Sequence, residues 1–295
     1  MADPRRGIAV VASALSLVLS GGALVSAADP SPSFPDPAPP GMVLVWADEF
    51  DAPAGTPPDP TRWGHDLGDG GSGWGNQELE WYTDSTDNAA HDGHGNLVIT
   101  AREAEPGLTC WYGPCEYTSA RLLTRGLFEV THGRIEARLR VPSGAGLWPA
   151  FWMLGSDIDT VGWPQSGEID IMENVGRQPR LLYGTLHGPG YSGSQGFGGT
   201  LLMDQPLADE FHVFAVDWQP GRIAWTVDGV QYHEATPADV APSQWVFEHP
   251  FFLLLNLAVG GQFGQAVSTT TQFPAQYLVD YVRVYQAAAP SPSPG

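Results

Sequence analysis

Residues 212–234 read HVFAVDWQPGRIAWTVDGVQYHE, and this stretch decides the fold class. Apolar and polar side chains alternate along much of it, which is the pattern of a β-strand with one face in water. Turn-forming residues interrupt the pattern at 219–221 (Gln-Pro-Gly) and at 228–229 (Asp-Gly). The stretch therefore predicts a β-meander.

The same alternation continues on both sides of this stretch. Ile135, Ala137, Leu139 and Val141 alternate with charged residues at 134, 136, 138 and 140. Further strands are expected at residues 44–50, 97–102, 147–154, 168–172, 251–259 and 278–285. With 36 Gly and 27 Pro between many short strands, the sequence predicts an all-β fold, a β-sandwich jelly roll whose curved, concave sheet forms a substrate cleft.

The two ends of the chain differ in composition from the centre. Arg5 and Arg6, an apolar run over residues 8–19 and small residues up to 28 predict a signal peptide at 1–28. A membrane anchor is the alternative, but two glycines interrupt a run already shorter than the ~20 residues of a spanning helix. A proline-rich linker is expected at 29–41, the folded domain at 42–286 and a Pro/Ser-rich tail at 287–295. We therefore expect a secreted, extracellular protein.

The charge balance narrows the class of partner. Asp and Glu outnumber Lys and Arg by 33 to 13, which gives a net charge of −20. This charge disfavours nucleic acids, anionic membranes and sulfated or uronic polysaccharides as partners. We expect a neutral substrate, and no membrane association after removal of the signal peptide.

The two cysteines, Cys110 and Cys115, flank a turn-prone Trp-Tyr-Gly-Pro spacer. In an oxidising compartment they are expected to form one local disulfide. Because its loop is small, such a bond restrains a surface turn more than it stabilises the whole fold.

A cluster of acids marks the candidate site. The segment GEIDIMEN places Glu168, Asp170 and Glu173 within six residues of an apolar, strand-forming stretch. Side chains alternate between the faces of a strand, so Glu173 should point away from the other two acids. A β-bulge near Ile171 and Met172 would return it to their face.

Such a group of carboxyls can perform acid and nucleophilic chemistry. Two carboxyls about 5 Å apart suit a double displacement at an anomeric carbon. Mutual repulsion keeps one acid protonated near neutral pH, which supplies a nucleophile and an acid. A solvated strand face or a calcium site is the alternative. Trp148, Trp152 and Trp163 favour the chemical reading because aromatic faces pack on sugar rings, although Trp148 and Trp152 could be core residues.

The hexapeptide EIDIME resembles the signature of family 16 glycoside hydrolases, in the bulged form typical of laminarinase-like endo-β-1,3-glucanases. Other segments resemble that family in the same order: residues 46–50 (WADEF), 74–78 (WGNQE), 117–121 (YTSAR), 146–152 (GLWPAFW), 185–188 (TLHG) and 280–285 (DYVRVY). Together they extend over nearly all of residues 43–286.

The resemblance implies roles for individual residues. Glu168 would be the nucleophile and Glu173 the general acid/base. Asp170 would assist by bonding to the nucleophile and tuning both charges, with a purely structural role as the alternative. Substrate contacts are implied for Asn76, Arg121, Trp148, Trp152, Trp163 and His187. Taken alone, His187 would more simply be a strand histidine with a structural partner.

The resemblance also implies a structural calcium ion, and no cofactor for catalysis. The ligands would be the Asp280 side chain and main-chain oxygens near Glu49 and Gly95, since calcium prefers hard oxygen ligands. An aspartate on an exposed strand face is an equally good explanation of Asp280.

The implied activity is endo-hydrolysis of β-1,3-glucan of the laminarin type, with retention of configuration through a covalent glycosyl-enzyme intermediate. We expect the protein to be a monomer. The extra Met172 distinguishes the motif from the unbulged, lichenase-type form, but β-1,3/1,4-glucan stays open as a substrate, and so does transglycosylation. Agar- and carrageenan-cleaving relatives share the bulge, yet the net charge disfavours sulfated substrates. A non-catalytic β-glucan-binding protein on the same fold is the alternative class. Such a protein needs aromatic platforms but no opposed glutamates, so the three acids favour catalysis.

Overall fold

The computed structural model describes residues 38–288. Strands form its framework from β1 (Met42–Asp48) to β19 (Ala275–Ala287). The predicted signal peptide, most of the proline-rich linker and the end of the tail lie outside the described residues. Within residues 38–288, none of the helices has the length and apolar character needed to cross a bilayer.

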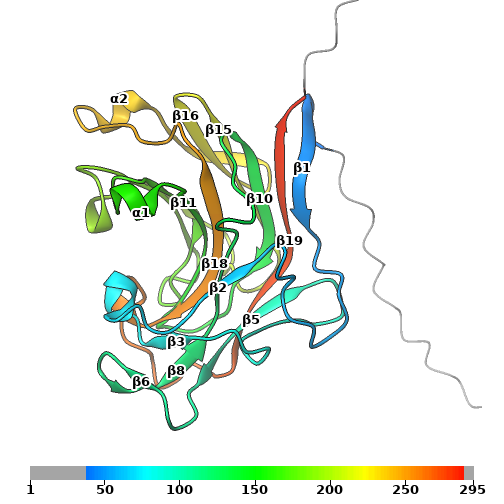
Figure 1. Cartoon of the computed structure of the whole chain (residues 1–295), viewed down its shortest axis with the longest axis vertical. Helices are drawn as coiled ribbons and strands as arrows, with labels where there is room; N and C mark the ends of the chain where they lie inside the picture. Colours follow the sequence, from blue (N-terminus) through cyan, green and yellow to red (C-terminus); the bar gives the residue numbers. More distant parts are fainter. Residues whose placement is uncertain (1–37, 289–295) are drawn as a thin grey trace, which may run out of the picture. The chain divides into compact units, whose positions relative to one another are not determined.

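The strands form two large stacked sheets and one small hairpin (Figure 1). The ten-stranded sheet has the order β17 (Val230–Ala235), β16 (Arg222–Val227), β15 (His212–Gln219), β10 (Gly133–Arg140), β19, β5 (Leu97–Glu103), β8 (Tyr117–Ser119) and β3 (Glu80–Tyr82), with β1 paired to β19 and β4 (Ala89–His91) paired to β5. The seven-stranded sheet has the order β14 (Phe197–Leu202), β13 (Leu181–His187), β12 (Glu168–Glu173), β11 (Leu147–Gly155), β18 (Phe251–Val259), β9 (Arg121–Leu123) and β2 (Gly64–Asp66). The hairpin consists of β6 (Thr109–Cys110) and β7 (Gly113–Pro114).

The predicted meander is confirmed as β15, β16 and β17. Gln219 pairs with Arg222 around the Pro-Gly turn, and Val227 pairs with Val230 around the Asp-Gly turn. Asp228 at the second turn has φ 50°, a left-handed conformation that Asp adopts more readily than β-branched residues. The all-β jelly roll expected from the sequence is the fold of this domain.

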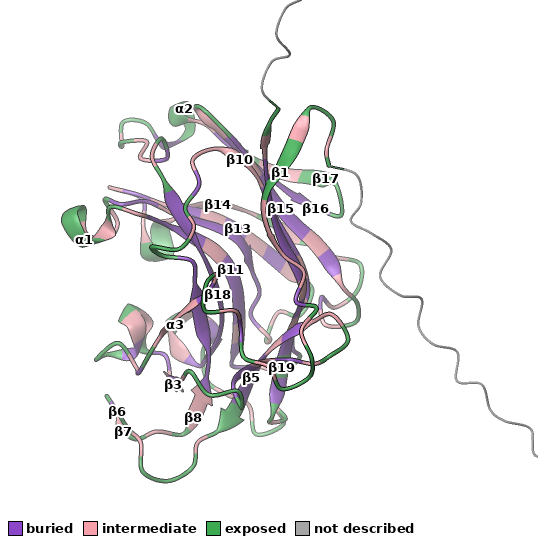
Figure 2. Ribbon diagram, turned by 45° about the vertical axis from the view of Figure 1, so that its right-hand side comes forward, coloured by how far each residue is buried: buried purple, intermediate pink, exposed green. Residues whose placement is uncertain are grey.

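The core lies between the two large sheets. β18 is buried along all nine residues, and alternate side chains from Phe251 to Val259 enter the main core cluster. From β11, Leu147, Phe151 and Met153 enter the same cluster. Trp148 and Trp152 therefore point to the other face of the seven-stranded sheet, as their shared strand face predicted. Figure 2 shows the buried positions along both sheets.

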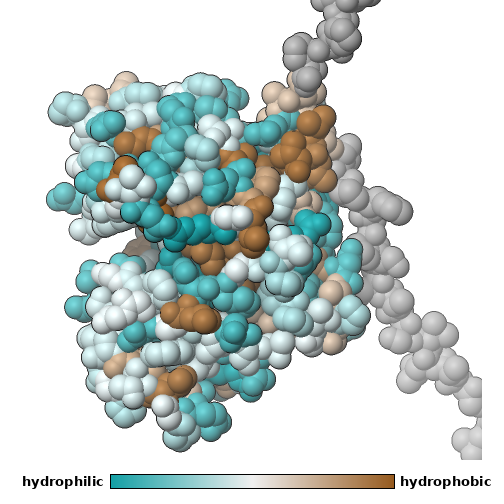
Figure 3. All heavy atoms as spheres, in the orientation of Figure 1, coloured by the Kyte–Doolittle hydropathy of each residue, from teal (hydrophilic) through white to brown (hydrophobic). Residues whose placement is uncertain are grey.

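That second face of the seven-stranded sheet carries the candidate site. Short helical turns flank it, η1 (Gly73–Gln77) and α3 (Gly261–Gly264) at one end and α1 (Ile158–Val161) and α2 (Pro237–Val240) at the other (Figure 1). A third turn, η2 (Gly193–Gln195), precedes β14. The surface in Figure 3, in the orientation of Figure 1, is notched at its left edge between the two flanking groups. The notch and the curved strands together form the concave face expected from the sequence.

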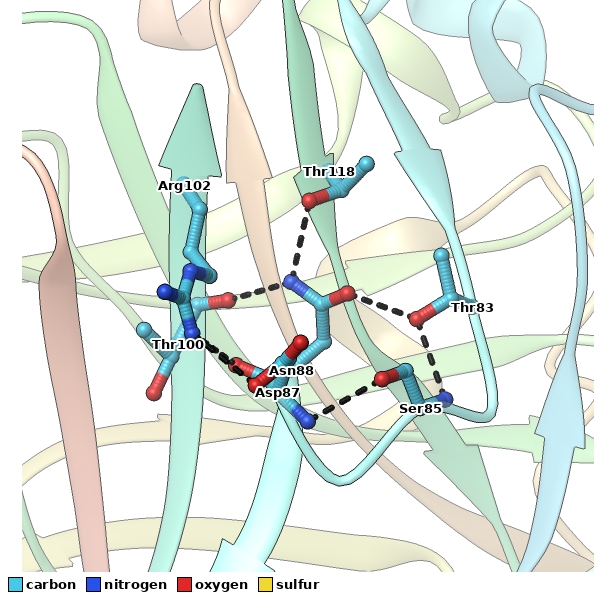
Figure 4. A network of polar contacts seen from close by, with 7 residues as sticks. All are labelled: Thr83, Ser85, Asp87, Asn88, Thr100, Arg102 and Thr118. Atoms are coloured by element: carbon cyan, nitrogen blue, oxygen red, sulfur yellow. Dashed lines mark hydrogen bonds and ion pairs between the residues drawn. The ribbon is translucent and has the colours of Figure 1, made fainter. Parts of the chain in front are cut away.

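A polar network fixes the loop that follows β3 (Figure 4). The Asn88 amide donates to the Thr100 carbonyl (2.8 Å) and to Thr118 Oγ1 (3.2 Å). Its side-chain oxygen accepts from Thr83 Oγ1 at 2.6 Å. The short strand β3, which pairs in parallel with β8, is thereby tied to β5 and β8. This anchoring holds in place β3, whose Glu80 and Tyr82 are buried.

Candidate active site

A bulge in β12 sets the direction of the three acids. Opposite β11, Met172 pairs with Phe151 and Asp170 pairs with Trp152, so Ile171 has no partner on that strand. The register against β13 also shifts between Asp170 and Glu173. The bulge predicted near Ile171 and Met172 is confirmed.

The bulge separates apolar from acidic side chains. Ile169, Ile171 and Met172 are at most 1% exposed and belong to the main core cluster. Glu168, Asp170 and Glu173 instead meet aromatic and imidazole groups on the concave face. Two consecutive core residues thus replace the strict alternation that would have put Glu173 into the core.

Glu168 lies at the start of β12 beside an indole and an imidazole. Trp163 Nε1 donates to Glu168 Oε2 at 2.8 Å, and His187 Nε2 lies 3.7 Å from Oε1. Burial, followed by the charge of Asp170, raises the Glu168 pKa to about 8. The charges of His187 and Arg121 and the Trp163 hydrogen bond oppose this rise, because each favours the ionised form.

Asp170 lies deeper in the same group. It is 3% exposed, and its Oδ2 lies 3.1 Å from His187 Nε2. Burial raises the Asp170 pKa to about 8, against a lowering contribution from a hydrogen bond with Glu168. Because both carboxyls titrate well above their ordinary range and bond to each other, the pair holds a shared proton near neutral pH.

Glu173 ends the strand and is 9% exposed. Trp148 Nε1 donates to its Oε1 at 2.9 Å. Burial, reinforced by the charge of Asp170, raises the Glu173 pKa well above its ordinary value. This shift favours the protonated form of Glu173, which is the state that a general acid requires.

The residues expected to contact substrate gather around these acids. The ring centroids of Trp163 and His187 are 6.0 Å apart, and His187 pairs with Glu168 across β12 and β13. The Arg121 guanidinium carbon lies 4.8 Å from the Trp152 ring centroid. The structure therefore brings these four residues, together with Trp148, onto the face that carries the acids.

A chain of hydrogen bonds connects Trp152 to Asn76. Trp152 Nε1 donates to Asn256 Oδ1 (2.8 Å), and the Asn256 amide donates to the Tyr82 hydroxyl (3.0 Å). That hydroxyl donates to Glu78 Oε2 (3.2 Å), and Asn76 Nδ2 donates to Glu78 Oε1 (3.0 Å). The two predicted contact residues are thus positioned by one buried polar network.

Several residues of this network were not identified from the sequence. Asp66 holds Arg121 through an ion pair of 2.9 Å, and Asn256 and Glu78 orient Trp152 and Asn76. Glu80 is fully buried, and burial together with the Glu78 charge raises its pKa well above the ordinary value. One signal was available, since the amide of Asn256 interrupts the otherwise apolar run FFLLLNLAV.

The residues predicted to bind calcium lie on β19 and beside the ends of β1 and β5, not on β12. β19 pairs with β5 up to Val279 and with β1 from Val282, and Asp280 is the extra residue opposite β10. Asp280 thus lies between the two pairings; Gly95 precedes β5 and Glu49 follows β1 along the chain. The Asp280 carboxylate forms an ion pair with Arg138, and the Glu49 carboxylate forms one with Arg283.

The acids of the site could themselves hold a cation. One ligand atom from each of Glu168, Asp170 and His187 lies within 4.8 Å of the others. Proton sharing between Glu168 and Asp170 explains the same closeness without an ion.

The predicted disulfide between Cys110 and Cys115 is confirmed.

Comparison with known proteins identifies similar sequences and structures. The model of the glycosyl hydrolases family 16 matches residues 74–283. A beta-glucanase from Rhodothermus marinus is 46% identical over 254 residues, which cover 82% of this chain and 85% of the relative. The catalytic domain of an endo-1,3-beta-glucanase (laminarinase) from Thermotoga petrophila RKU-1 superposes with a TM-score of 0.78 at 44% identity, covering 84% of this chain and 99% of that one. For the endo-beta-1,3-glucanase from Pyrococcus furiosus the TM-score is 0.79 at 45% identity, with 84% and 96% covered.

Proposed function

The chain belongs to glycosyl hydrolases family 16 and is a glycoside hydrolase, and on this premise we propose that it cleaves internal linkages of β-1,3-glucan with retention of anomeric configuration. The bulge in β12 carries the proposal, because it puts Glu168, Asp170 and Glu173 on one face with an indole donor on each glutamate.

In the first step an oxygen of ionised Glu168 attacks the anomeric carbon. The bond from that carbon to the leaving sugar oxygen breaks, and the Glu173 proton moves to this oxygen. The products are a glycosyl ester on Glu168 and a shortened chain with a new hydroxyl. The Trp163 hydrogen bond supports the step by favouring the charged form of Glu168.

In the second step water replaces the departed sugar. Glu173, now ionised, takes a proton from the water, whose oxygen attacks the anomeric carbon and breaks the ester to Glu168. Two inversions at one carbon give net retention. Asp170 assists both steps, because it bonds to Glu168 and its charge raises the pKa of Glu173.

β-1,3-Glucan is the substrate that the features of this chain favour. Met172, the second of two consecutive core residues at the bulge, distinguishes the site from the unbulged motif, and the net charge of −20 disfavours sulfated chains. The face offers Trp148, Trp152 and Trp163 as apolar platforms for neutral sugar rings.

The test compares hydrolysis of laminarin, lichenan, agarose and carrageenan. We expect laminarin to be the best substrate. Glu168→Gln should lower the rate on laminarin by about 10³-fold or more, while the exposed Glu103→Gln should leave it unchanged. If the native protein binds laminarin without cleaving it, the function is glucan binding and the role of Glu168 is wrong. If lichenan is cleaved faster than laminarin, the mixed-linkage alternative replaces the proposal.

We further propose that a calcium ion stabilises the domain without entering the chemistry. Asp280 and main-chain oxygens near Glu49 and Gly95 would hold it. The place of Asp280 between the pairings of β19 with β5 and β1 supports this proposal, and carboxylate and carbonyl oxygens suit the ion. We expect chelation by EDTA to lower Tm by several degrees, and calcium to restore it. Asp280→Asn should abolish the response, whereas Arg138→Met, which removes only the ion pair, should keep it. A Tm insensitive to EDTA and calcium would contradict the site.

We also propose that the protein is exported. The basic start, apolar run and small residues of segment 1–28 support export, as does a disulfide, which persists in oxidising compartments. N-terminal sequencing of the secreted protein should begin near residue 28.

A further inference from the structure

The disulfide hairpin presents an aromatic side chain that the proposed mechanism does not use. β6 and β7 form a separate two-stranded unit, and the bond between Cys110 and Cys115 closes it. Its turn carries Trp111, whose side chain is 41% exposed. An exposed indole face offers an apolar platform on which a sugar ring can pack.

Hydrogen bonds hold the turn in one position against the segment around η1. The Trp111 main-chain N–H donates to Asp69 Oδ2 (2.6 Å), and its indole N–H donates to the Glu78 carbonyl (2.8 Å). The Tyr112 hydroxyl donates to the Leu79 carbonyl at 2.6 Å. Because the indole N–H is already bonded, the exposed part of the ring is apolar.

The place of Trp111 connects it to the active site. A Cβ atom added to Gly73, where φ is +69°, would lie 2.9 Å from Trp111 Nε1, so the indole passes directly over this glycine. The next residue, Trp74, has its ring 4.6 Å from the Arg121 guanidinium, which also lies 4.8 Å from the Trp152 ring. Aromatic and guanidinium groups thus continue from the acids to the hairpin.

The ribbon views show on which side of the domain the hairpin lies. The hairpin lies at the same end of the domain as β3 and η1, beyond the notch seen in Figure 3 (Figures 1 and 2). Tyr112 meets the Trp111 ring edge-on, with centroids 5.4 Å apart and planes at 81°. The 41% exposure of Trp111 shows that ring area remains free for another group.

From these contacts we infer that Trp111 forms an outlying subsite, which stacks on a glucose ring of a neutral glucan chain that extends beyond Trp74. The inference rests on the proposed β-glucanase function and adds a preference for long chains. A ring that is already held in place loses little side-chain entropy on binding. The disulfide and the three hydrogen bonds hold Trp111 in place in this way.

The test measures kcat/KM on laminarin and on the short chain laminaritetraose, which we expect not to contact the hairpin. Trp111→Ala should lower kcat/KM on laminarin about fivefold, equivalent to ~1 kcal/mol of stacking, mainly through KM, and leave the value on laminaritetraose unchanged. Val230→Ala, at an exposed position of β17 in the other sheet, should change neither value.

Trp111→Phe separates stacking from support of η1, because it keeps a ring but loses the indole N–H. We expect it to retain most of the laminarin activity. If it behaves as Trp111→Ala, or if Trp111→Ala weakens both substrates equally, the residue supports η1 and the subsite is refuted. Equal kcat/KM for native and Trp111→Ala on laminarin also refutes it. Failure of the native protein to cleave laminarin would instead refute the proposed function.

The disulfide offers an independent test that leaves the ring intact. Replacing both Cys110 and Cys115 by Ser should free the turn and weaken laminarin binding, with the rate on laminaritetraose preserved. Affinity electrophoresis in laminarin, with Glu168→Gln in every variant to prevent cleavage, reports the binding directly. Unchanged migration of both the Trp111→Ala and the double Ser variant would contradict the subsite.

Discussion

Burial raises the pKa of all three acids of β12, but each acid has different contacts. Glu168 accepts a hydrogen bond from Trp163, and Glu173 accepts one from Trp148. Asp170 contacts His187 and bonds to Glu168. Similar carboxyl groups can therefore act as nucleophile, assistant and acid because their surroundings differ.

Asp170→Asn tests this arrangement through the pH dependence of kcat/KM on laminarin. The Asp170 charge raises the pKa of both Glu168 and Glu173, so its removal lowers both values. The acidic limb, where the nucleophile ionises, and the basic limb, where the acid loses its proton, should both move to lower pH by about one unit. Unmoved limbs would show that Asp170 does not tune the two glutamates. Asp217→Asn, in the other sheet, is the control.

At the scale of elements, the bulge in β12 decides which residues can react. In a regular strand the five-residue spacing of Glu168 and Glu173 would put them on opposite faces. The register shift opposite β11 corrects this with one extra residue. Ile171 and Met172 both enter the core as a result.

Changes of strand length should therefore act in opposite ways. Deletion of Met172 gives the sequence EIDIE, in which alternation alone keeps the three acids on one face, so laminarin hydrolysis should remain measurable. The loss of a buried Met side chain should cost about 2–5 kcal/mol of stability. Insertion of Ala after Met172 should turn Glu173 from the site and abolish activity. Laminarin assays together with circular dichroism decide the outcome, and a folded but inactive deletion variant would contradict the argument.

Alternation and turn residues were sufficient to predict the long strands β1, β5, β10 to β12 and β15 to β19 within a few residues. The short strands β2 to β4 and β6 to β9 were not predicted, nor were β13 and β14. β14 was not predicted because Gly198 and Gly199 interrupt its pattern. A Cβ on Gly199 would lie 2.3 Å from the His233 ring, so packing against β17 requires glycine there. The order of the strands in the sheets could not be predicted from the sequence either, because pairing such as that of β11 with β18 joins residues about a hundred positions apart.

The same limit applied to the site. The three acids, the bulge and the shared face of Trp148 and Trp152 were evident from local spacing. The partners that hold substrate contacts in place were not, because Asp66 and Asn256 reach Arg121 and Trp152 only through pairing of distant strands. Long-range pairing, rather than composition, decides which polar residues meet.

At the scale of the whole molecule, the site lowers stability in favour of chemistry. Glu168 and Asp170 have pKa values of about 8 in the folded protein, against 4.5 and 3.8 ordinarily. The folded state therefore binds more protons than the unfolded state between these values. The contribution of these two groups to stability is fully present below pH about 4 and is lost as the pH rises through about 8.

This linkage predicts how the free energy of unfolding depends on pH. Glu168→Gln removes one of the raised carboxyls, so its stability should fall less between pH 5 and pH 8 than that of the native protein, by about 1–3 kcal/mol. Glu103→Gln should follow the native curve. Urea unfolding at both pH values measures the difference, and parallel curves for native protein and Glu168→Gln would contradict the raised pKa.

The most direct test of the central claim, that Glu168 and Glu173 act as a retaining pair, is the anomeric configuration of the first product. Laminarin hydrolysis is followed by proton NMR during the first minutes, before mutarotation mixes the anomers. We expect the β-anomer to appear first, because attack by Glu168 and then by water inverts the carbon twice. Initial release of the α-anomer would show a single displacement and contradict the role given to Glu168.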